Sequence, residues 1–220
     1  MLARRSLAPF ALAGIVGPLC FAILVIVQET LIPEYSHVRQ PISALAAYPT
    51  GWLQRLNFYQ AGVLLAVFTI GLHLAVRATR FGIVSIVLLL LAAVGMIGAG
   101  LFSWIMVDGV PTETTAHVVP SVMVFAGEGL GLIALSRRLR ADASWRGLAA
   151  YTLVTGAAVL VSFVAVGVLG IPDDAPLHPW VGVLQRVIVA LWFACTITLA
   201  ARMWRLAPRA AADAPSVSSP

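Results

Sequence analysis

Long apolar runs alternate with short polar connections along most of the chain. Six of these runs approach the length of about 20 residues with which an α-helix crosses a bilayer core of roughly 30 Å. They cover approximately residues 7–28, 57–76, 82–106, 118–136, 148–170 and 180–203. Because lipid cannot satisfy free backbone N–H and C=O groups, each run is expected to be helical. The pattern predicts an all-α, polytopic membrane bundle of six transmembrane helices.

Composition leaves little room for anything outside this bundle. Charged residues make up only 10% of the chain and the mean hydropathy is +0.97, whereas a soluble domain of this size needs more charge to cover its surface. We therefore expect one six-span domain over residues 1–206. The first run is long and five others follow it, so we expect a retained helix rather than a signal peptide. Residues 207–220, rich in Ala, Pro and Ser, are expected to form a disordered cytoplasmic tail.

The basic residues are all arginines, and their distribution predicts the orientation. Of the 14, eleven lie near the N-terminus, in every second connection or near the C-terminus, and only Arg39, Arg55 and Arg186 lie at the opposite ends of the runs. Basic residues near span ends stay in the cytoplasm, so both termini are expected there. The net charge of +5 then indicates contact with lipid headgroups and not with nucleic acid. The absence of Lys, with abundant Ala, Arg, Val and Gly, favours a GC-rich bacterial genome and hence a multi-pass protein of the bacterial plasma membrane.

Polar residues that could carry chemistry gather at the other end of the runs. The connections 29–56, 107–117 and 171–179 contain three of the four histidines and six of the nine acidic residues. Glu128 lies deeper, near the middle of the fourth run, on the same helix face as His117. Intramembrane charges are costly and face the interior of a bundle. The spacing predicts an outward-opening polar cavity, whose expected lining is Asp108, His117, Glu128, Gln185 and Arg186.

Four segments in this order resemble a known family. They read "YSHVRQPISAL", "GWLQRLNFYQAG", "VDGVPTETTAH" and "GVLQRVIVALW". Together they are similar to the bacterial and archaeal membrane proteins grouped as domain of unknown function 998. The resemblance implies six spans. The residues of this chain that match the family's motif positions are Arg39, Pro41, Ser43, Leu45, Asp108, His117 and Arg186. The chain departs from the family where Asp108 is followed by Gly instead of Pro, and the family name implies no activity.

The segment 35–43 and the histidines each allow two interpretations. The segment can be a structured loop in which Arg39 pairs with an acid and Ser43 caps an interfacial helix over 45–56. Alternatively, Ser43 or His37 is catalytic, although no G-x-S-x-G elbow is present. The histidines, with Asp108, could bind zinc, yet none of the usual ligand spacings occurs. We therefore expect no metal and no cofactor, and a hydrogen bond from His117 to Asp108 or Glu128.

Three functions remain open from the sequence. The leading hypothesis is a protein that binds a lipid headgroup, a small ligand or a membrane protein partner. The residues expected to bind are Arg39, Asp108, His117, Glu128, Gln185 and Arg186. The second hypothesis is a hydrolase or transferase acting on lipid at the outer leaflet, with His117 and Asp108 as its acid–base pair and Ser43 as a further catalytic candidate. The third is a small proton-coupled transporter in which Glu128 titrates, although Glu128 and Arg186 could instead form a buried ion pair.

Overall fold

The computed structural model of the chain describes residues 7–172 and 174–207. Its long helices are α1 (Leu7–Leu31), α2 (Gly51–Ala75), α3 (Arg80–Leu101), α4 (Thr115–Arg140), α5 (Ala149–Leu169) and α6 (Val181–Leu206). The connections contain the 3₁₀ helices η2 (Ile42–Ala47), η3 (Arg146–Leu148) and η4 (His178–Trp180), and the strands β1 (Ile105–Val107) and β2 (Val110–Thr112). In the described part of the chain, six helices are long and apolar enough to cross a membrane, which confirms the six-span, all-α prediction.

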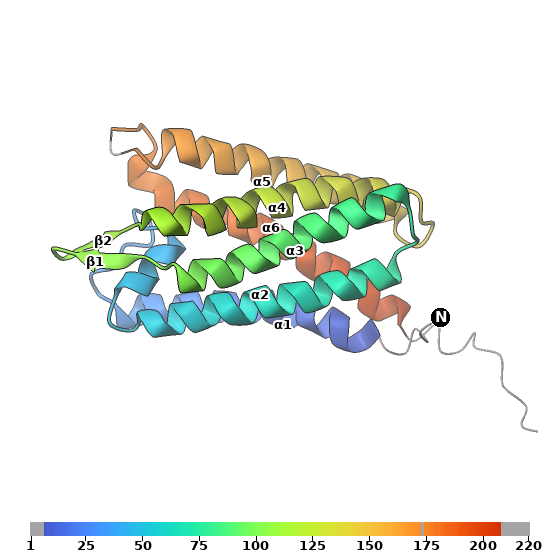
Figure 1. The fold of residues 1–220 in the computed structure, drawn as a ribbon, viewed down its shortest axis with the longest axis horizontal. Coiled ribbons are helices and arrows are strands. Elements are labelled where there is room, and N and C mark those ends of the chain that lie inside the picture. The colour runs from blue at the N-terminus through green and yellow to red at the C-terminus, as the bar shows by residue number, and fades with distance from the viewer. Residues whose placement is uncertain (1–6, 173, 208–220) are drawn as a thin grey trace, which may run out of the picture.

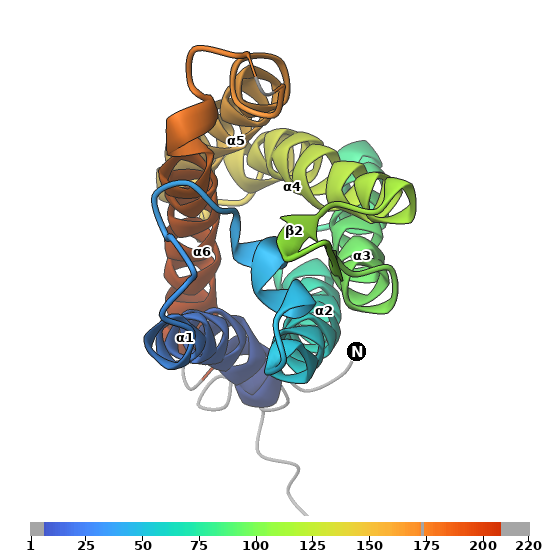
Figure 2. The ribbon, with the colours of Figure 1, turned by 90° about the vertical axis from the view of Figure 1, so that its left-hand side faces the viewer.

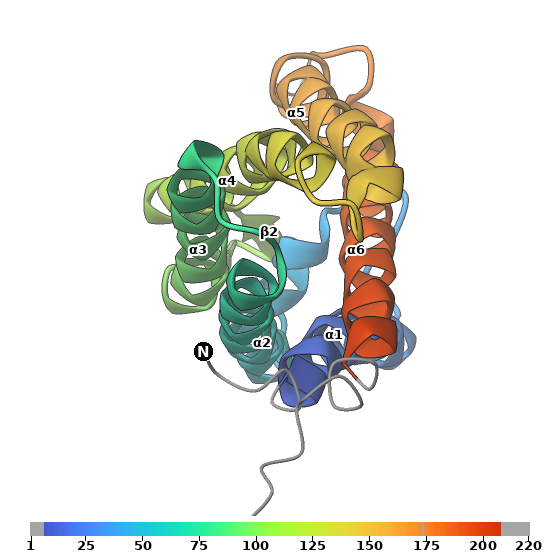
Figure 3. The same cartoon turned by 90° about the vertical axis from the view of Figure 1, so that its right-hand side faces the viewer.

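The six helices lie side by side and form a closed ring when viewed from either end (Figures 1, 2 and 3). Each helix packs against its neighbours in the sequence, and α6 closes the ring against α1. Large aliphatic side chains cover the outside, with exposed fractions of 58% for Ile23, 64% for Ile83 and 70% for Val161. An apolar outer surface of this kind is the surface that a bundle presents to lipid.

Glycines let α3 and α4 approach most closely. A methyl group on Gly95 would lie 2.8 Å from the carbonyl oxygen of Pro120, and one on Gly127 would lie 2.8 Å from the carbonyl oxygen of Leu88. Real Cβ atoms do not come so close to a backbone, so both positions need glycine. In lipid, the hydrophobic effect does not drive helices together, and small residues stabilise the packing by allowing close van der Waals contact.

The two ends of the ring differ in their connections. The end that we call the hairpin end carries residues 32–50, the strands β1 and β2, and residues 170–172 and 174–180, on the left in Figure 1. The end that we call the terminal end carries the first residues of α1, the last residues of α6, and the α2–α3 and α4–α5 connections. Of the tail expected at 207–220, only Ala207 lies within the described residues.

Two predicted boundaries were wrong at the hairpin end. An interfacial helix over 45–56 does not form, because η2 ends at Ala47 and α2 already begins at Gly51. Ser43 lies inside η2, where Pro41 occupies the N-cap position, so the hydroxyl of Ser43 caps no helix. The third helix ends at Leu101, and the residues that follow form a hairpin in which Val107 pairs with Val110.

The hairpin explains the departure from the expected Asp-Pro pair. Asp108 and Gly109 have φ values of 48° and 80°, both in the left-handed region. A two-residue turn with positive φ at both positions matches the twist of a β-hairpin and favours Asp-Gly. A proline at position 109 could not adopt this conformation, because its ring fixes φ near −65°.

At the terminal end, a buried arginine holds the α2–α3 connection against α4. Arg138 is only 2% exposed and donates from Nε to the carbonyl oxygen of Arg77 at 2.9 Å. Its Nη2 donates to the carbonyl oxygens of His73, at 2.7 Å, and Val76. These carbonyls belong to the end of α2 and the residues after it, which have no helical partners. The guanidinium therefore satisfies the C-terminus of α2 from a neighbouring helix, and we call this arrangement the Arg138 clamp.

Candidate functional site

A second arginine, Arg186, holds the segment after α1 at the hairpin end. Its Nη1 donates to the carbonyl oxygens of Gly182, at 2.9 Å, and Gln40, at 3.2 Å. Its Nη2 donates to the phenol oxygen of Tyr35 at 2.7 Å and forms a salt bridge with Glu29. Arg186 thus joins α6 to the end of α1 and to the loop between α1 and η2. We call this arrangement the Arg186 clamp.

Tyr35 extends the clamp into the loop. Burial raises the pKa of Tyr35 to about 12, and the nearby positive charge of Arg186 only partly offsets that effect. The phenol therefore keeps its proton and can donate to the carbonyl oxygens of Gln40 and Pro41, at 3.1 and 3.0 Å. Its oxygen remains available as the acceptor for Arg186.

The segment 35–47, which we call the lid, rests directly on the first turns of α6. Gly182 N donates to the carbonyl oxygen of Val38 at 3.0 Å, and Ile42 N donates to Oε1 of Gln185 at 2.6 Å. A methyl group on Gly182 would lie 2.5 Å from the carbonyl oxygens of His37 and Gln40, so only glycine allows this contact. Figure 2 shows the light-blue end of the lid inside the ring of helices. The segment is structured, but without the Ser43-capped helix over 45–56 that the structured-loop interpretation included.

Beneath the lid is a cavity that we call the central cavity. Its volume is about 40 Å³, measured over the centres of water molecules that fit in it, and its wall is mainly apolar. One water needs roughly 10–15 Å³ on this measure, so the cavity holds only a few waters. The polar residues in its wall are Ser43, His117, Ser121 and Gln185. They come from η2, α4 and α6, so the cavity lies where the lid meets the bundle.

His117 is oriented by the end of α3. Its Nδ1 lies 2.7 Å from the carbonyl oxygen of Phe102, which can only accept, so Nδ1 carries a proton. The ring lies against those of Phe58 and Trp104, with centroids 6.5 Å away in each case. The remaining nitrogen, Nε2, is the one left to bind a ligand. Nδ1 thus pairs with a backbone carbonyl, where the sequence led us to expect a carboxylate.

A groove on the outer surface lies next to the central cavity. This groove, which we call the lateral groove, runs between α1 and α6 and has a volume of about 240 Å³. Ala22, Val25, Ile26 and Ala190 line it along the helices, and the Glu29–Arg186 pair lies in its wall. Four side chains line both the groove and the cavity, and they are Phe21, Ile42, Val189 and Phe193. We call these four the partition.

Glu128 lies deeper than the central cavity and apart from Arg186. Its side chain is 1% exposed, and its Oε2 has no hydrogen-bond partner. The indole of Trp192 and the thiol of Cys195, both on α6, are close enough to interact with the carboxyl. Nε1 of Trp192 nevertheless has no hydrogen-bond partner, because the indole and the carboxyl of Glu128 are close but not in hydrogen-bond geometry. The predicted Glu128–Arg186 ion pair is therefore wrong, since the acid at Arg186 is Glu29.

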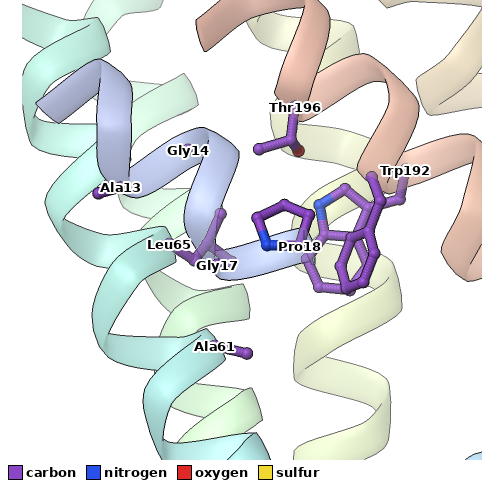
Figure 4. A pocket seen from close by; sticks show the side chains of 9 residues that line it. Ala13, Gly14, Gly17, Pro18, Ala61, Leu65, Trp192 and Thr196 are labelled. Carbon is purple, nitrogen blue, oxygen red and sulfur yellow. The ribbon is translucent and has the colours of Figure 1, made fainter. Parts of the chain in front are cut away.

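A smaller pocket of about 20 Å³ lies next to the central cavity, between α1, α2 and α6 (Figure 4). Gly14, Gly17 and Pro18 of α1 face Trp192 and Thr196 of α6 across it. Trp192 and Phe193 line both spaces. Pro18 has no N–H for the carbonyl of Gly14, so α1 is locally less regular where it lines this pocket.

Comparison with known proteins identifies the family. A sequence model described as Protein of unknown function (DUF998) matches residues 15–202. This range covers most of the chain, including the lid, the hairpin, and every residue that lines the central cavity and the lateral groove. The chain belongs to the DUF998 family. The resemblance drawn from the sequence is thereby confirmed, while no curated protein and no solved structure matches this DUF998 chain.

The residues predicted to form one site in this DUF998 protein lie in different places. His117 and Gln185 line the central cavity, as does Ser43, and Arg186 lines the lateral groove. Arg39 and Asp108 are exposed at the hairpin end, Asp108 at the hairpin tip, and neither lines the cavity. His37 is exposed as well, whereas Nδ1 of His178 lies 3.0 Å from the carbonyl oxygen of Gly170. Among residues 7–172 and 174–207, no three His, Cys, Asp or Glu side chains are grouped as metal ligands.

Sequence reasoning missed a chain of buried amides between α1 and α2. Nε2 of Gln28 donates to Oε1 of Gln54 at 2.9 Å, and Nδ2 of Asn57 donates to the carbonyl oxygen of Phe21 at 3.1 Å. Nε2 of Gln60 continues the chain to Oδ1 of Asn57 at 3.1 Å. Gln54, Asn57 and Gln60 recur every three residues, a spacing that places them on one helix face. The signal was in the sequence, but starting the second span at 57 left Gln54 in a loop.

Proposed function

We propose that this DUF998 protein binds a membrane lipid at its hairpin end. The acyl chain lies in the lateral groove, the headgroup lies at the Glu29–Arg186 pair, and the central cavity is the inner part of the same site. The observation that carries the proposal is that one layer of side chains, the partition, separates a lipid-facing groove from a cavity containing Ser43, His117 and Gln185.

The chemistry of the two spaces supports a lipid over a water-soluble ligand. The groove has apolar walls along α1 and α6 and a charged pair in its wall at the hairpin end. Ligand sites are mostly apolar with a few convergent polar groups, and the central cavity has this character. When Phe21 and Phe193 move apart, Nε2 of His117 and the hydroxyls of Ser43 and Ser121 become available to an ester or hydroxyl group.

The other two hypotheses have less support. An acid–base pair of His117 and Asp108 would need a carboxylate beside a cavity residue, yet Asp108 lies exposed at the hairpin tip. Oε2 of Glu128 has no hydrogen-bond partner among the described residues, but Glu128 does not line the central cavity or the lateral groove.

Filling the lateral groove tests the proposal. Ala190→Trp places a large ring among the groove residues. Displacing two methylenes of the acyl chain from the groove would cost about 1.6 kcal/mol of binding free energy. The variant is therefore expected to reduce the lipid retained by the purified protein roughly tenfold. The matched control is Ala157→Trp, on the exposed side of α5 away from the groove. Mass spectrometry of the co-purifying lipids provides the measurement. The proposal fails if the wild-type protein enriches no lipid class over the bulk, or if both variants behave alike.

The orientation belongs to the same proposal. We place the terminal end in the cytoplasm and the hairpin end outside, in the bacterial plasma membrane, on the distribution of the arginines. An impermeant thiol reagent added to intact cells is then expected to label Asp108→Cys and not Arg140→Cys, both at exposed positions. The native Cys20 and Cys195 lie within spans and give little background. The reverse labelling pattern would place the lipid site in the inner leaflet.

A further inference from the structure

A further hollow lies at the terminal end, opposite the proposed lipid site. It has a volume of about 700 Å³ and lies between the α4–α5 connection and the last turns of α6. On one side, Ser144, Trp145 and Leu148 form its wall, and on the other side Ile197, Arg202 and Arg205 do so. Neither the lateral groove nor the central cavity shares a residue with it.

Two arginines on one face of α6 give this hollow its charge. Arg202 donates from Nε and Nη2 to the carbonyl oxygen of Ser144, at 2.9 and 2.6 Å. A guanidinium has five N–H donors, so three of them remain. Arg205 is one turn further along the same face and makes no hydrogen bond or ion pair with any described residue. Among the described residues, the hollow thus has unused donors and positive charge with no salt-bridge partner.

Asp142, in the connection that forms one wall of the hollow, makes no salt bridge with Arg202 or Arg205. Asp142 accepts from the backbone N–H of Arg77 through Oδ2 and from that of Ser144 through Oδ1, both at 2.9 Å. Both of its oxygens therefore serve the fold of the α2–α3 and α4–α5 connections. Within residues 7–172 and 174–207, no acid forms a salt bridge with Arg202 or Arg205.

We expect the hollow to lie at the depth of the membrane interface, next to lipid. Trp204, beside Arg205, is 46% exposed, and exposed tryptophans at span ends favour the headgroup region. Only 22% of the most apolar segment of α5 is buried, compared with 50% for α4. Lipid therefore covers most of α5, and the seam between α5 and α6 leads from it into the hollow, past Leu148 and Ile197.

We propose that this hollow binds the headgroup of an anionic phospholipid. The phosphate accepts hydrogen bonds from Arg202 and Arg205, and an acyl chain lies along Leu148 and Ile197 in the α5–α6 seam. Arginine suits this role because its planar fork matches the oxygens of a phosphate. The apolar wall selects a lipid over a free anion, because a free phosphate gains nothing from Leu148 and Ile197.

The test compares nanodiscs of phosphatidylcholine alone with nanodiscs that also contain phosphatidylglycerol. The purified full-length protein is expected to retain phosphatidylglycerol over phosphatidylcholine when the bound lipids are counted by native mass spectrometry. Arg205→Gln should lower this preference about fivefold, the effect of roughly 1 kcal/mol per arginine near an anionic surface. Because Arg205 is exposed and makes no hydrogen bond or ion pair with the described residues, its loss is expected to leave the fold intact. Arg202→Gln should lower the preference as well.

The matched control removes charge at the same end but outside the hollow. Arg77→Gln and Arg140→Gln change exposed arginines that do not line it, so both are expected to keep the preference. An equal loss in these controls would show diffuse attraction and overturn the site. Inorganic phosphate provides the last comparison. If it protects the protein against thermal unfolding as well as phosphatidylglycerol does, the hollow binds a free anion and the lipid proposal fails.

Discussion

Arg186→Met is expected to release the lid and to lower the free energy of unfolding by about 2–4 kcal/mol. The reason is that breaking a largely buried ion pair leaves the charge of Glu29 uncompensated. The substitution keeps an unbranched apolar stem and removes every donor that binds Glu29, Tyr35, Gly182 and Gln40. The side chains of Arg186 and Glu29 are 23% and 22% exposed, so water replaces only part of what they lose. Denaturant unfolding in detergent measures the stability.

The same variant has a second readout that a general loss of stability would not give. Ser43 lies in the lid and is 6% exposed, so a cysteine there is expected to react slowly with a thiol reagent in the parent protein. With Arg186→Met, the reaction should become at least about tenfold faster under native conditions, because local opening of the lid then costs roughly 1.4 kcal/mol less. Unchanged labelling would mean that the lid is held by Gly182 and Gln185 without the clamp.

A double variant and an exposed control separate the causes. Adding Glu29→Gln to Arg186→Met removes the stranded charge, and it should recover about half of the lost stability, since contacting residues are strongly coupled. Arg39→Met, at an exposed arginine in the same loop, should change stability by no more than about 0.5 kcal/mol. A loss at Arg39 as large as that at Arg186 would contradict the assignment of the clamp.

Helices in this chain follow from its sequence because lipid imposes one rule on every span. Each backbone polar group must be satisfied within its own helix, so the length and position of the apolar runs predicted α1, α4, α5 and α6 closely. The same rule does not apply beyond the hydrocarbon. The errors therefore lie at the hairpin end, where η2, the start of α2 and the β1–β2 hairpin replaced the expected continuous helices. The Val-Asp-Gly-Val stretch is a strong hairpin signal, and it was interpreted instead as a variant of an Asp-Pro motif.

Side-chain partners were harder to predict than helices, because they depend on which helices become neighbours in space. Charge and depth indicated that Arg186 needed an acid, and Glu128 was the most buried acid in the sequence. The ring places α6 against α1 and separates most of it from α4, so Glu29 is the acid within reach. His117 shows the same limit, because the end of α3 supplies the carbonyl of Phe102 and the hairpin carries Asp108 away.

Arg138→Ala is expected to lower the free energy of unfolding by about 2–4 kcal/mol. Each buried acceptor left without a hydrogen bond costs roughly 1–3 kcal/mol, and hydration by water recovers part of that cost. The variant removes the donors that serve the carbonyls of His73, Val76 and Arg77. These carbonyls end α2, so the α2–α3 connection is expected to loosen. Faster proteolysis within residues 76–79, measured on protein folded in detergent, is the local readout.

Arg138→Lys distinguishes the geometry of the clamp from its charge. A lysine keeps the positive charge but has donors on a single atom, so it cannot reach three carbonyls that a planar fork spans. It is therefore expected to recover less than half of the stability lost in Arg138→Ala. Arg140→Ala, two residues away and exposed, serves as the control and should stay within about 0.5 kcal/mol of the parent. Full recovery by lysine would show that charge near the C-terminus of α2 is sufficient, and the clamp would then be an electrostatic contact with the helix dipole.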